Sequence, residues 1–149
     1  MNENYTDRTI GIIGSRRRNE TADFLQVFHK LEEIREQHCL DSVTIVSGGA
    51  KKGGDHFAEF IAEKGRIPII IHRPDKANLD EHLMEVNPRA AHAQINYARN
   101  TLIANDSDIL IACVADDRRG GTESTIKTFL KKIKMKETEA IEKGLLYLV

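Results

Sequence analysis

Five short apolar runs, rich in β-branched residues, alternate along the chain with longer segments of helical period. The runs are residues 9–13, 43–46, 67–71, 109–114 and 145–149. Apolar runs of this length without regular polar alternation are typical of strands covered on both faces. Apolar residues recur every three or four positions at 21–38, 55–65, 88–104 and from 122 onward, which predicts amphipathic helices. Residues 73–87 show neither pattern, so a loop or lid with one helical turn is expected there.

The order of these elements predicts an α/β fold, a Rossmann-like three-layer sandwich. Parallel neighbouring strands need helical crossovers, which are almost always right-handed. We expect a parallel sheet with strand order 3-2-1-4-5, helices on both faces, and a single domain over residues 1–149. Ligands of open parallel sheets bind at the carboxyl ends of the strands, where the strand order reverses. The site is therefore expected between the first and fourth strands.

The bulk composition narrows the function classes. With 22 basic and 23 acidic residues, the net charge of -1 gives no positive field over the whole molecule, and only 5% of residues are aromatic. The composition therefore argues against nucleic-acid binding. No apolar run suits a membrane span or a secretory leader, so the cytoplasm is the expected location. Cys39 and Cys113 suit reduced thiols, and no histidine motif is present, so we expect neither a metal nor a cofactor.

The turn after the first predicted strand reads Gly14-Ser15-Arg16. It combines a glycine that allows close approach of the backbone, a hydroxyl and a guanidinium that can pair with an anion. In the alternative interpretation, Gly14 only turns the chain and Arg16 begins a solvated basic run.

Four glycines follow the second strand, in the segment SGGAKKGGD of residues 47–55. Glycines there can leave backbone amides free to cradle a phosphate beside a helix N-terminus. Asp55 has two interpretations, a cap for the following helix or an acceptor for a ribose hydroxyl. The spacing matches neither a Walker A loop nor a dinucleotide fingerprint. The binding residues predicted in this turn are Ser47, Gly48, Gly49, Ala50, Lys51, Gly54 and Asp55.

The turn after the fourth strand repeats this arrangement with Gly120, Gly121 and Thr122, and the threonine is expected to cap the last helix. Arg99 and Asn100 lie near the end of the preceding helix, opposite its expected apolar stripe. They are either ligand-binding residues or ordinary surface residues. The expected apolar stripe consists of Ala91, Ile95, Ala98 and Leu102.

In combination these motifs resemble the SLOG superfamily, over about residues 8–130. They are most similar to its YspA/YpsA-related, DUF2493-like branch, and more distantly to the Lonely Guy phosphoribohydrolases and the DprA/Smf recombination mediators. The resemblance implies a Rossmann-like fold and a nucleotide-derived ligand. Because such relatives commonly pair through helices, it also favours a homodimer.

Two departures from the family pattern bear on activity. The hydrolase branch has a glutamate three residues after the threonine of its Gly-Thr motif, whereas Thr125 stands three residues after Thr122 here. The second turn also holds one extra residue, which is expected to widen it. These departures argue against Lonely Guy activity, and Glu123 or Asp116 would be the catalytic carboxylate of any hydrolase.

Three functions therefore follow from the sequence. The first is a protein that binds a nucleotide or nucleotide-derived ligand, as a sensor or a processing protein. The second is an N-glycosidic hydrolase or transferase that acts on a nucleoside monophosphate through a carboxylate. The third, single-stranded DNA binding of the DprA kind, is weakened by the near-neutral charge and the low aromatic content. Whether the protein is an enzyme is left open.

Overall fold

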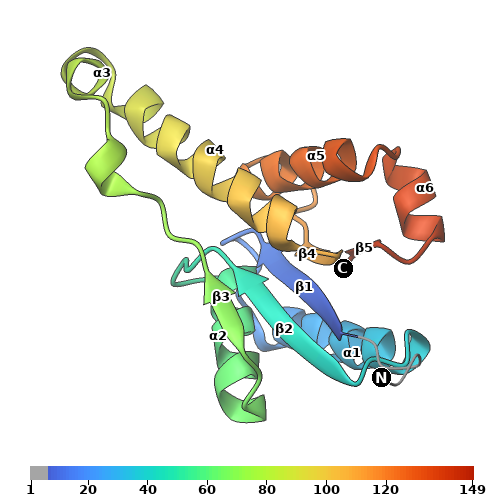
Figure 1. The fold of residues 1–149 in the computed structure, drawn as a ribbon. Helices are drawn as coiled ribbons and strands as arrows, with labels where there is room; N and C mark the ends of the chain where they lie inside the picture. Colours follow the sequence, from blue (N-terminus) through green and yellow to red (C-terminus); the bar gives the residue numbers. More distant parts are fainter. Residues whose placement is uncertain (1–6) are drawn as a thin grey trace.

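The computed structural model describes residues 7–149, which form a five-stranded parallel sheet between two helical layers (Figure 1). The strand order is β3-β2-β1-β4-β5, so the predicted α/β topology is confirmed. The strands are β1 (Asp7–Gly14), β2 (Ser42–Ser47), β3 (Ile69–Ile71), β4 (Ile109–Cys113) and β5 (Leu146–Leu148). The helices are α1 (Thr21–Gln37), α2 (Gly54–Gly65), α3 (Glu81–Val86), α4 (Pro88–Asp106), α5 (Gly121–Ile133) and α6 (Glu137–Glu142), with a 3-10 turn η1 at Lys76–Asn78.

Strand β1 lies at the centre of the sheet and explains why its sequence is apolar without alternation. Ile10 pairs with Ile45 of β2 and with Ile109 of β4, and all three side chains are buried. Successive residues of a strand point to opposite faces, so a strand covered on both sides needs apolar residues throughout.

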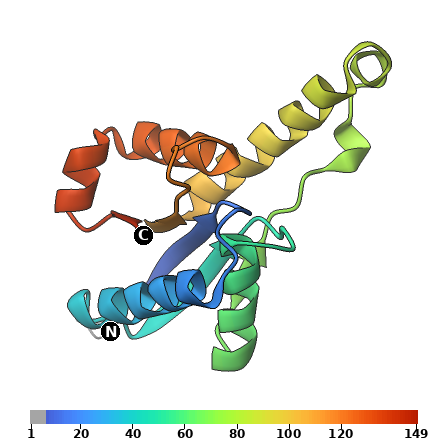
Figure 2. The same ribbon diagram turned by 180° about the vertical axis from the view of Figure 1, so that it is seen from behind.

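Two hydrophobic cores, one on each face of the sheet, hold the helices in place. On one face, Ile12 packs in a cluster with Leu31 of α1 and Phe57 of α2. On the other face, Ile13 belongs to a cluster with Ile103 of α4 and Phe129 of α5. Seen from behind, α1 and α2 lie on one side of the sheet and α4, α5 and α6 on the other (Figure 2). The sandwich has the three layers predicted from the sequence.

The start of α4 is as predicted, because Asn87 caps the helix by accepting the amide of Ala90 at 3.1 Å. Helix α2 spans Gly54–Gly65, close to the predicted 55–65, and the left-handed residue that follows it is Arg66, with φ of 54°. The expected loop holds η1 and α3, and α6 was not predicted, because helices of three to six residues leave too short a periodic pattern to recognise.

The chain between β3 and the middle of α4 forms an arm that extends beyond the sheet. Both ribbon views show it running out from β3 to α3 and back along α4, whose first turns lie outside the layered body (Figures 1 and 2). Helix α3 packs against α4. This long helix therefore belongs to the layered core only in its C-terminal half.

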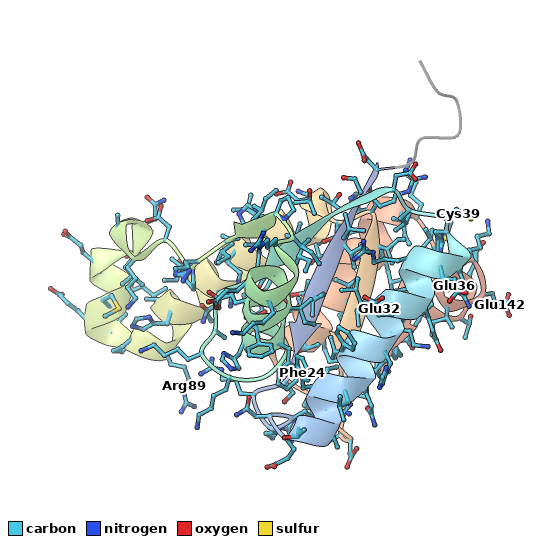
Figure 3. The ribbon with its side chains drawn as sticks, turned by 90° about the horizontal axis from the view of Figure 1, so that it is seen from below. Phe24, Glu32, Glu36, Cys39, Arg89 and Glu142 are labelled. Carbon is cyan, nitrogen blue, oxygen red and sulfur yellow. The ribbon has the colours of Figure 1, made fainter. Side chains whose placement is uncertain are left out.

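Both cysteines are free thiols with different surroundings. Cys39 is exposed just after α1, on the side of the molecule that faces the viewer in Figure 3. Cys113 is buried at the end of β4, and burial raises the pKa of its thiol to about 11. Within residues 7–149, no helix is both long and apolar enough to cross a membrane.

Candidate functional site

A cavity of about 260 Å³ opens at the carboxyl ends of β1 and β4, the place where the strand order reverses. The turn after β1, the turn after β4, helix α4 and the start of α2 all contribute to its walls. Its lining residues are Ile13, Gly14, Ser15, Arg16, Arg17, Ala50, Asp55, Arg99, Asn100, Ile103, Arg119, Gly120, Gly121, Thr122 and Thr125. Of the two glycine-rich turns predicted to face one crevice, the turn after β4 lines it with Gly120, Gly121 and Thr122, whereas the segment of residues 47–55 contributes only Ala50 and Asp55.

Most of the predicted site residues reach this cavity. Those in its lining are Gly14, Ser15, Arg16, Ala50, Asp55, Arg99, Asn100, Gly120, Gly121 and Thr122. Those outside the lining are Ser47, Gly48, Gly49, Lys51, Gly54, Asp116 and Glu123. Sequence reasoning missed Ile13, Arg17, Ile103, Arg119 and Thr125 as lining residues. Arg17 and Arg119 adjoin predicted positions, so their place in the sequence was the available signal.

In the turn after β2, the backbone amides that were predicted to bind a phosphate are not free. The carboxylate of Asp55 accepts the amide of Gly48 at 3.3 Å and that of Ala50 at 3.1 Å. The amide of Gly49 is directed at the hydroxyl of Ser47. A carboxylate from the protein thus occupies the place that the predicted phosphate would need, so Asp55 organises this turn from within.

The remaining glycines of this turn serve close packing. The amide of Gly53, with φ of 76°, donates to the side chain of Asn19 at 2.8 Å. A Cβ on Gly54 would lie 2.2 Å from the carbonyl carbon of Ile13. Helix α2 can therefore begin directly against the end of β1 only because position 54 has no side chain. This contact places Asp55 beside the cavity.

Asp55 is not the N-cap of α2, because Gly53 takes that position and Asp55 follows in the first helical turn. Its side chain is buried, and burial is the main cause that raises its pKa above the ordinary value. The amides of Ala50 and Gly48 and the positive charge of Arg99 oppose that shift. The carboxylate can still accept a hydrogen bond from a ligand, since each oxygen has two acceptor sites.

Helix α4 connects the two turns through Arg99 and Asn100. Arg99 donates through Nη1 to the carbonyl of Gly48 at 2.6 Å and through Nε to Oδ1 of Asn100 at 2.9 Å. The amide nitrogen of Asn100 donates to the carbonyl of Gly121 at 3.4 Å. Both residues therefore lie against the cavity, and the surface interpretation is wrong for them.

The surface interpretation of Arg99 and Asn100 is wrong because α4 is oriented differently from what its expected apolar stripe implied. Ala98 and Leu102 of the expected stripe are exposed, whereas Ile103 and Ala104 face the sheet. Burial of Ile103 and Ala104 turns the helix so that Asn100 points inward.

The N-terminus of α5 is open toward the cavity. Its N-cap is Gly120, with φ of 116°, so Thr122 does not cap the helix as predicted. No residue between 7 and 149 accepts the amide hydrogens of Gly121 and Thr122. A Cβ added at Gly120 or at Gly121 would find no heavy atom within 4 Å. Free amides at the positive end of a helix dipole favour a bound anion.

Four arginines line the cavity, and their ion pairing differs. Arg17 is paired with Asp117 at 2.7 Å, and its guanidinium also donates to the carbonyl of Arg119. Burial and the nearby charge of Arg16 lower the pKa of Arg99, while Asp55 opposes that shift. Arg16 and Arg119 form no ion pair with any carboxylate in the described part of the chain. The positive charges of Arg16 and Arg119 are therefore not compensated by a carboxylate at the cavity.

Neither predicted catalytic carboxylate lies in the cavity. Glu123 forms a two-point ion pair with Arg118, with both contacts at 2.8 Å, and neither residue is part of the cavity lining. Asp116 is exposed and outside the lining. Thr125 occupies the cavity wall instead, with its hydroxyl directed at the carbonyl of Gly121. Asp55 is the one carboxylate among the lining residues.

Replacing Asp55 by asparagine is expected to lower the free energy of unfolding by about 1–3 kcal/mol, because one of the two loop amides loses its acceptor. The loss should depend on pH. Since its pKa is raised in the folded state, Asp55 contributes most stability below its unfolded pKa and loses that contribution as the pH rises through the folded value. Urea unfolding of both proteins across this range should therefore show a larger difference in acid than at neutral pH. A difference that grows with rising pH would contradict this assignment.

The site thus combines an open helix N-terminus, uncompensated arginines and one internally bonded carboxylate. What it binds must be inferred from these residues. No family model matches this chain, and no curated protein or solved structure shows a significant match to it.

Proposed function

We propose that this cavity binds a nucleotide or nucleotide-derived ligand through its phosphate. The observation that carries the proposal is the open N-terminus of α5, where the amides of Gly121 and Thr122 have no acceptor among residues 7–149. A phosphate oxygen placed there would accept both amides in the field of the helix dipole. The nucleotide character of the ligand is supported by the resemblance to the SLOG superfamily.

The charges around the cavity support a ligand with more than one negative charge. Arg17 is neutralised by Asp117, and Arg99 faces Asp55, whereas Arg16 and Arg119 have no acidic partner in the described chain. A phosphate monoester carries a charge of roughly -1.5 to -2 at neutral pH. We assign Arg16 and Arg119 to the phosphate, and Asp55 and Asn100 to hydroxyls of the sugar.

The size of the cavity favours a small ligand over a polynucleotide. Its volume of about 260 Å³ is near the lower end of small-molecule sites, roughly 300–1,000 Å³. Its lining holds no aromatic side chain on which successive bases of a DNA strand would stack. The DprA-like alternative therefore has the least support.

Binding without cleavage fits the site better than hydrolysis. Cleavage of an N-glycosidic bond needs a carboxylate that stabilises the cationic sugar or activates water. Glu123 is held by Arg118, and Asp55 already accepts two amides. We therefore propose a sensor or carrier role ahead of an N-glycosidic hydrolase. The cytoplasmic location stays a prediction.

The proposal is tested by titrating the full chain with AMP, ADP-ribose and adenosine, with calorimetry for binding and chromatography for released adenine. We expect AMP or ADP-ribose to bind and raise the melting temperature, because a ligand that prefers the native state stabilises it. Adenosine, which lacks the phosphate, should bind at least about tenfold more weakly. Equal binding of adenosine and AMP would refute phosphate recognition. Release of adenine would favour the hydrolase alternative.

A further inference from the structure

An ion pair between Arg17 and Asp117 connects the turn after β1 to the turn after β4. Arg17 lines the cavity, whereas Asp117 lies outside its lining. The guanidinium donates to both oxygens of the carboxylate, at 2.9 Å to Oδ2 and at 2.7 Å to Oδ1. Arginine binds carboxylates and phosphates alike in this two-point geometry. The same donors of Arg17 therefore suit a phosphate as well as they suit Asp117.

The guanidinium of Arg17 already lies near the start of α5. Its Nη2 also donates to the carbonyl of Arg119 at 3.1 Å, and Arg119 immediately precedes the N-cap residue Gly120. The amides of Gly121 and Thr122, which have no acceptor among residues 7–149, follow directly. Because the side chain of Arg17 is 57% exposed, it can change rotamer toward these amides without displacing packed neighbours.

Solvent exposure makes this ion pair easy to exchange. The side chain of Asp117 is 47% exposed, so water reaches both partners. Ion pairs at such positions contribute little to stability, because both charges are well solvated without each other. The hydrogen bond from Arg17 lowers the pKa of Asp117 below its ordinary value, so the carboxylate is charged at neutral pH. Asp117 therefore competes with an anion that approaches Arg17.

Arg17 differs in this respect from the other arginines of the cavity. Among the four that line it, Arg17 is the one that forms an ion pair with a carboxylate within residues 7–149. Arg16 and Arg119 form none in that range, and Arg99 donates to the carbonyl of Gly48 instead. A phosphate that binds Arg17 must therefore displace a carboxylate, whereas one that binds Arg16 or Arg119 need not.

We propose that Asp117 and the phosphate of the ligand compete for Arg17, and that this competition sets the affinity of the cavity. A phosphate monoester carries a charge of roughly -1.5 to -2, more than the single charge of a carboxylate. The amides at the start of α5 bind it at the same time. It therefore displaces Asp117, and Arg17 joins Arg16 and Arg119 on the phosphate. Loss of the ion pair lowers the affinity and keeps binding reversible, as a sensor or carrier requires. This inference rests on the function proposed above.

Calorimetric titration of AMP across a double-mutant cycle tests the competition. Asp117→Asn removes the charge but keeps an oxygen for the amide of Arg119, which Asp117 accepts at 3.1 Å. It should tighten AMP binding by about tenfold, because Arg17 loses its competing partner. In an Arg17→Gln background, the same substitution should change the affinity by about threefold or less, because only a screened repulsion is removed. Adenosine, which lacks the phosphate, should bind wild type and Asp117→Asn equally.

Asp106→Asn is the matched control. It removes the same charge from a side chain that is 43% exposed, paired with His72 and outside the cavity lining, so its AMP affinity should equal that of wild type. An unchanged or lowered affinity of Asp117→Asn would overturn the competition. Equal gains with and without Arg17 would overturn it too, because Asp117 would then act only as a nearby negative charge. If wild type and every variant fail to bind AMP, phosphate recognition itself is refuted.

Discussion

Gly121→Val is expected to weaken binding of AMP or ADP-ribose by at least about a hundredfold while the protein keeps its fold. A Cβ at position 121 meets no heavy atom within 4 Å, and the backbone there is not left-handed. The branched side chain would instead fill the space in front of the free amides at the start of α5. Calorimetric titration measures the loss, and urea unfolding should stay within about 0.5 kcal/mol of wild type.

A graded series makes this result specific. Gly121→Ala adds one carbon and should lose less affinity than Gly121→Val does. Gly65→Ala, at the far end of α2, serves as a glycine control that should leave binding unchanged. If Gly121→Val binds the nucleotide as wild type does, the phosphate does not lie at the N-terminus of α5.

Gly54→Ala is expected to lower the free energy of unfolding by at least about 3 kcal/mol, or to prevent folding. The new Cβ would lie 2.2 Å from the carbonyl carbon of Ile13 and 2.4 Å from the amide nitrogen of Gly14. Both are backbone atoms of β1, so no side-chain rotation relieves the contact. Urea unfolding followed by circular dichroism measures the loss.

Gly65→Ala is the matched control in the same helix. Its Cβ would approach only the flexible end of Ile67, at 3.2 Å. Alanine is also a better helix former than glycine, so its free energy of unfolding should lie within about 1 kcal/mol of wild type, on the stabilised side. Equal effects of the two substitutions would mean that α2 does not pack closely against the end of β1.

The turn after β2 shows how far glycine content predicts a binding site. Its glycines predicted a phosphate nest, but Gly53 and Gly54 instead allow the backbone to lie closely against Ser15 and Ile13. The glycines did not indicate which group receives the amides, and Asp55 takes two of them. Glycine permits both a phosphate nest and tight packing of two backbones, so composition alone does not separate the two.

Helix α4 likewise shows that a sequence pattern can identify a helix without showing which of its sides is buried. Periodicity identified the helix and its cap at Asn87, but not which side faces the sheet. Ala98 and Leu102 fit the apolar period as well as Ile103 and Ala104 do, and only packing against β1 and α5 selects between them. Asn100 and Arg99 enter the cavity as a consequence of that choice.

The sequence alone determined the fold class, the strand order and the edge of the sheet where the cavity lies. Those features depend on patterns within a few residues, because burial on both faces requires continuous apolar strands and turns require glycine. Only the tertiary structure decided which charged groups remain free. Arg17 forms an ion pair with Asp117, and Glu123 forms one with Arg118. The amides of Gly121 and Thr122 have no acceptor in the described chain. Such pairings depend on side-chain direction and on contacts across about a hundred residues of chain, as between Arg17 and Asp117.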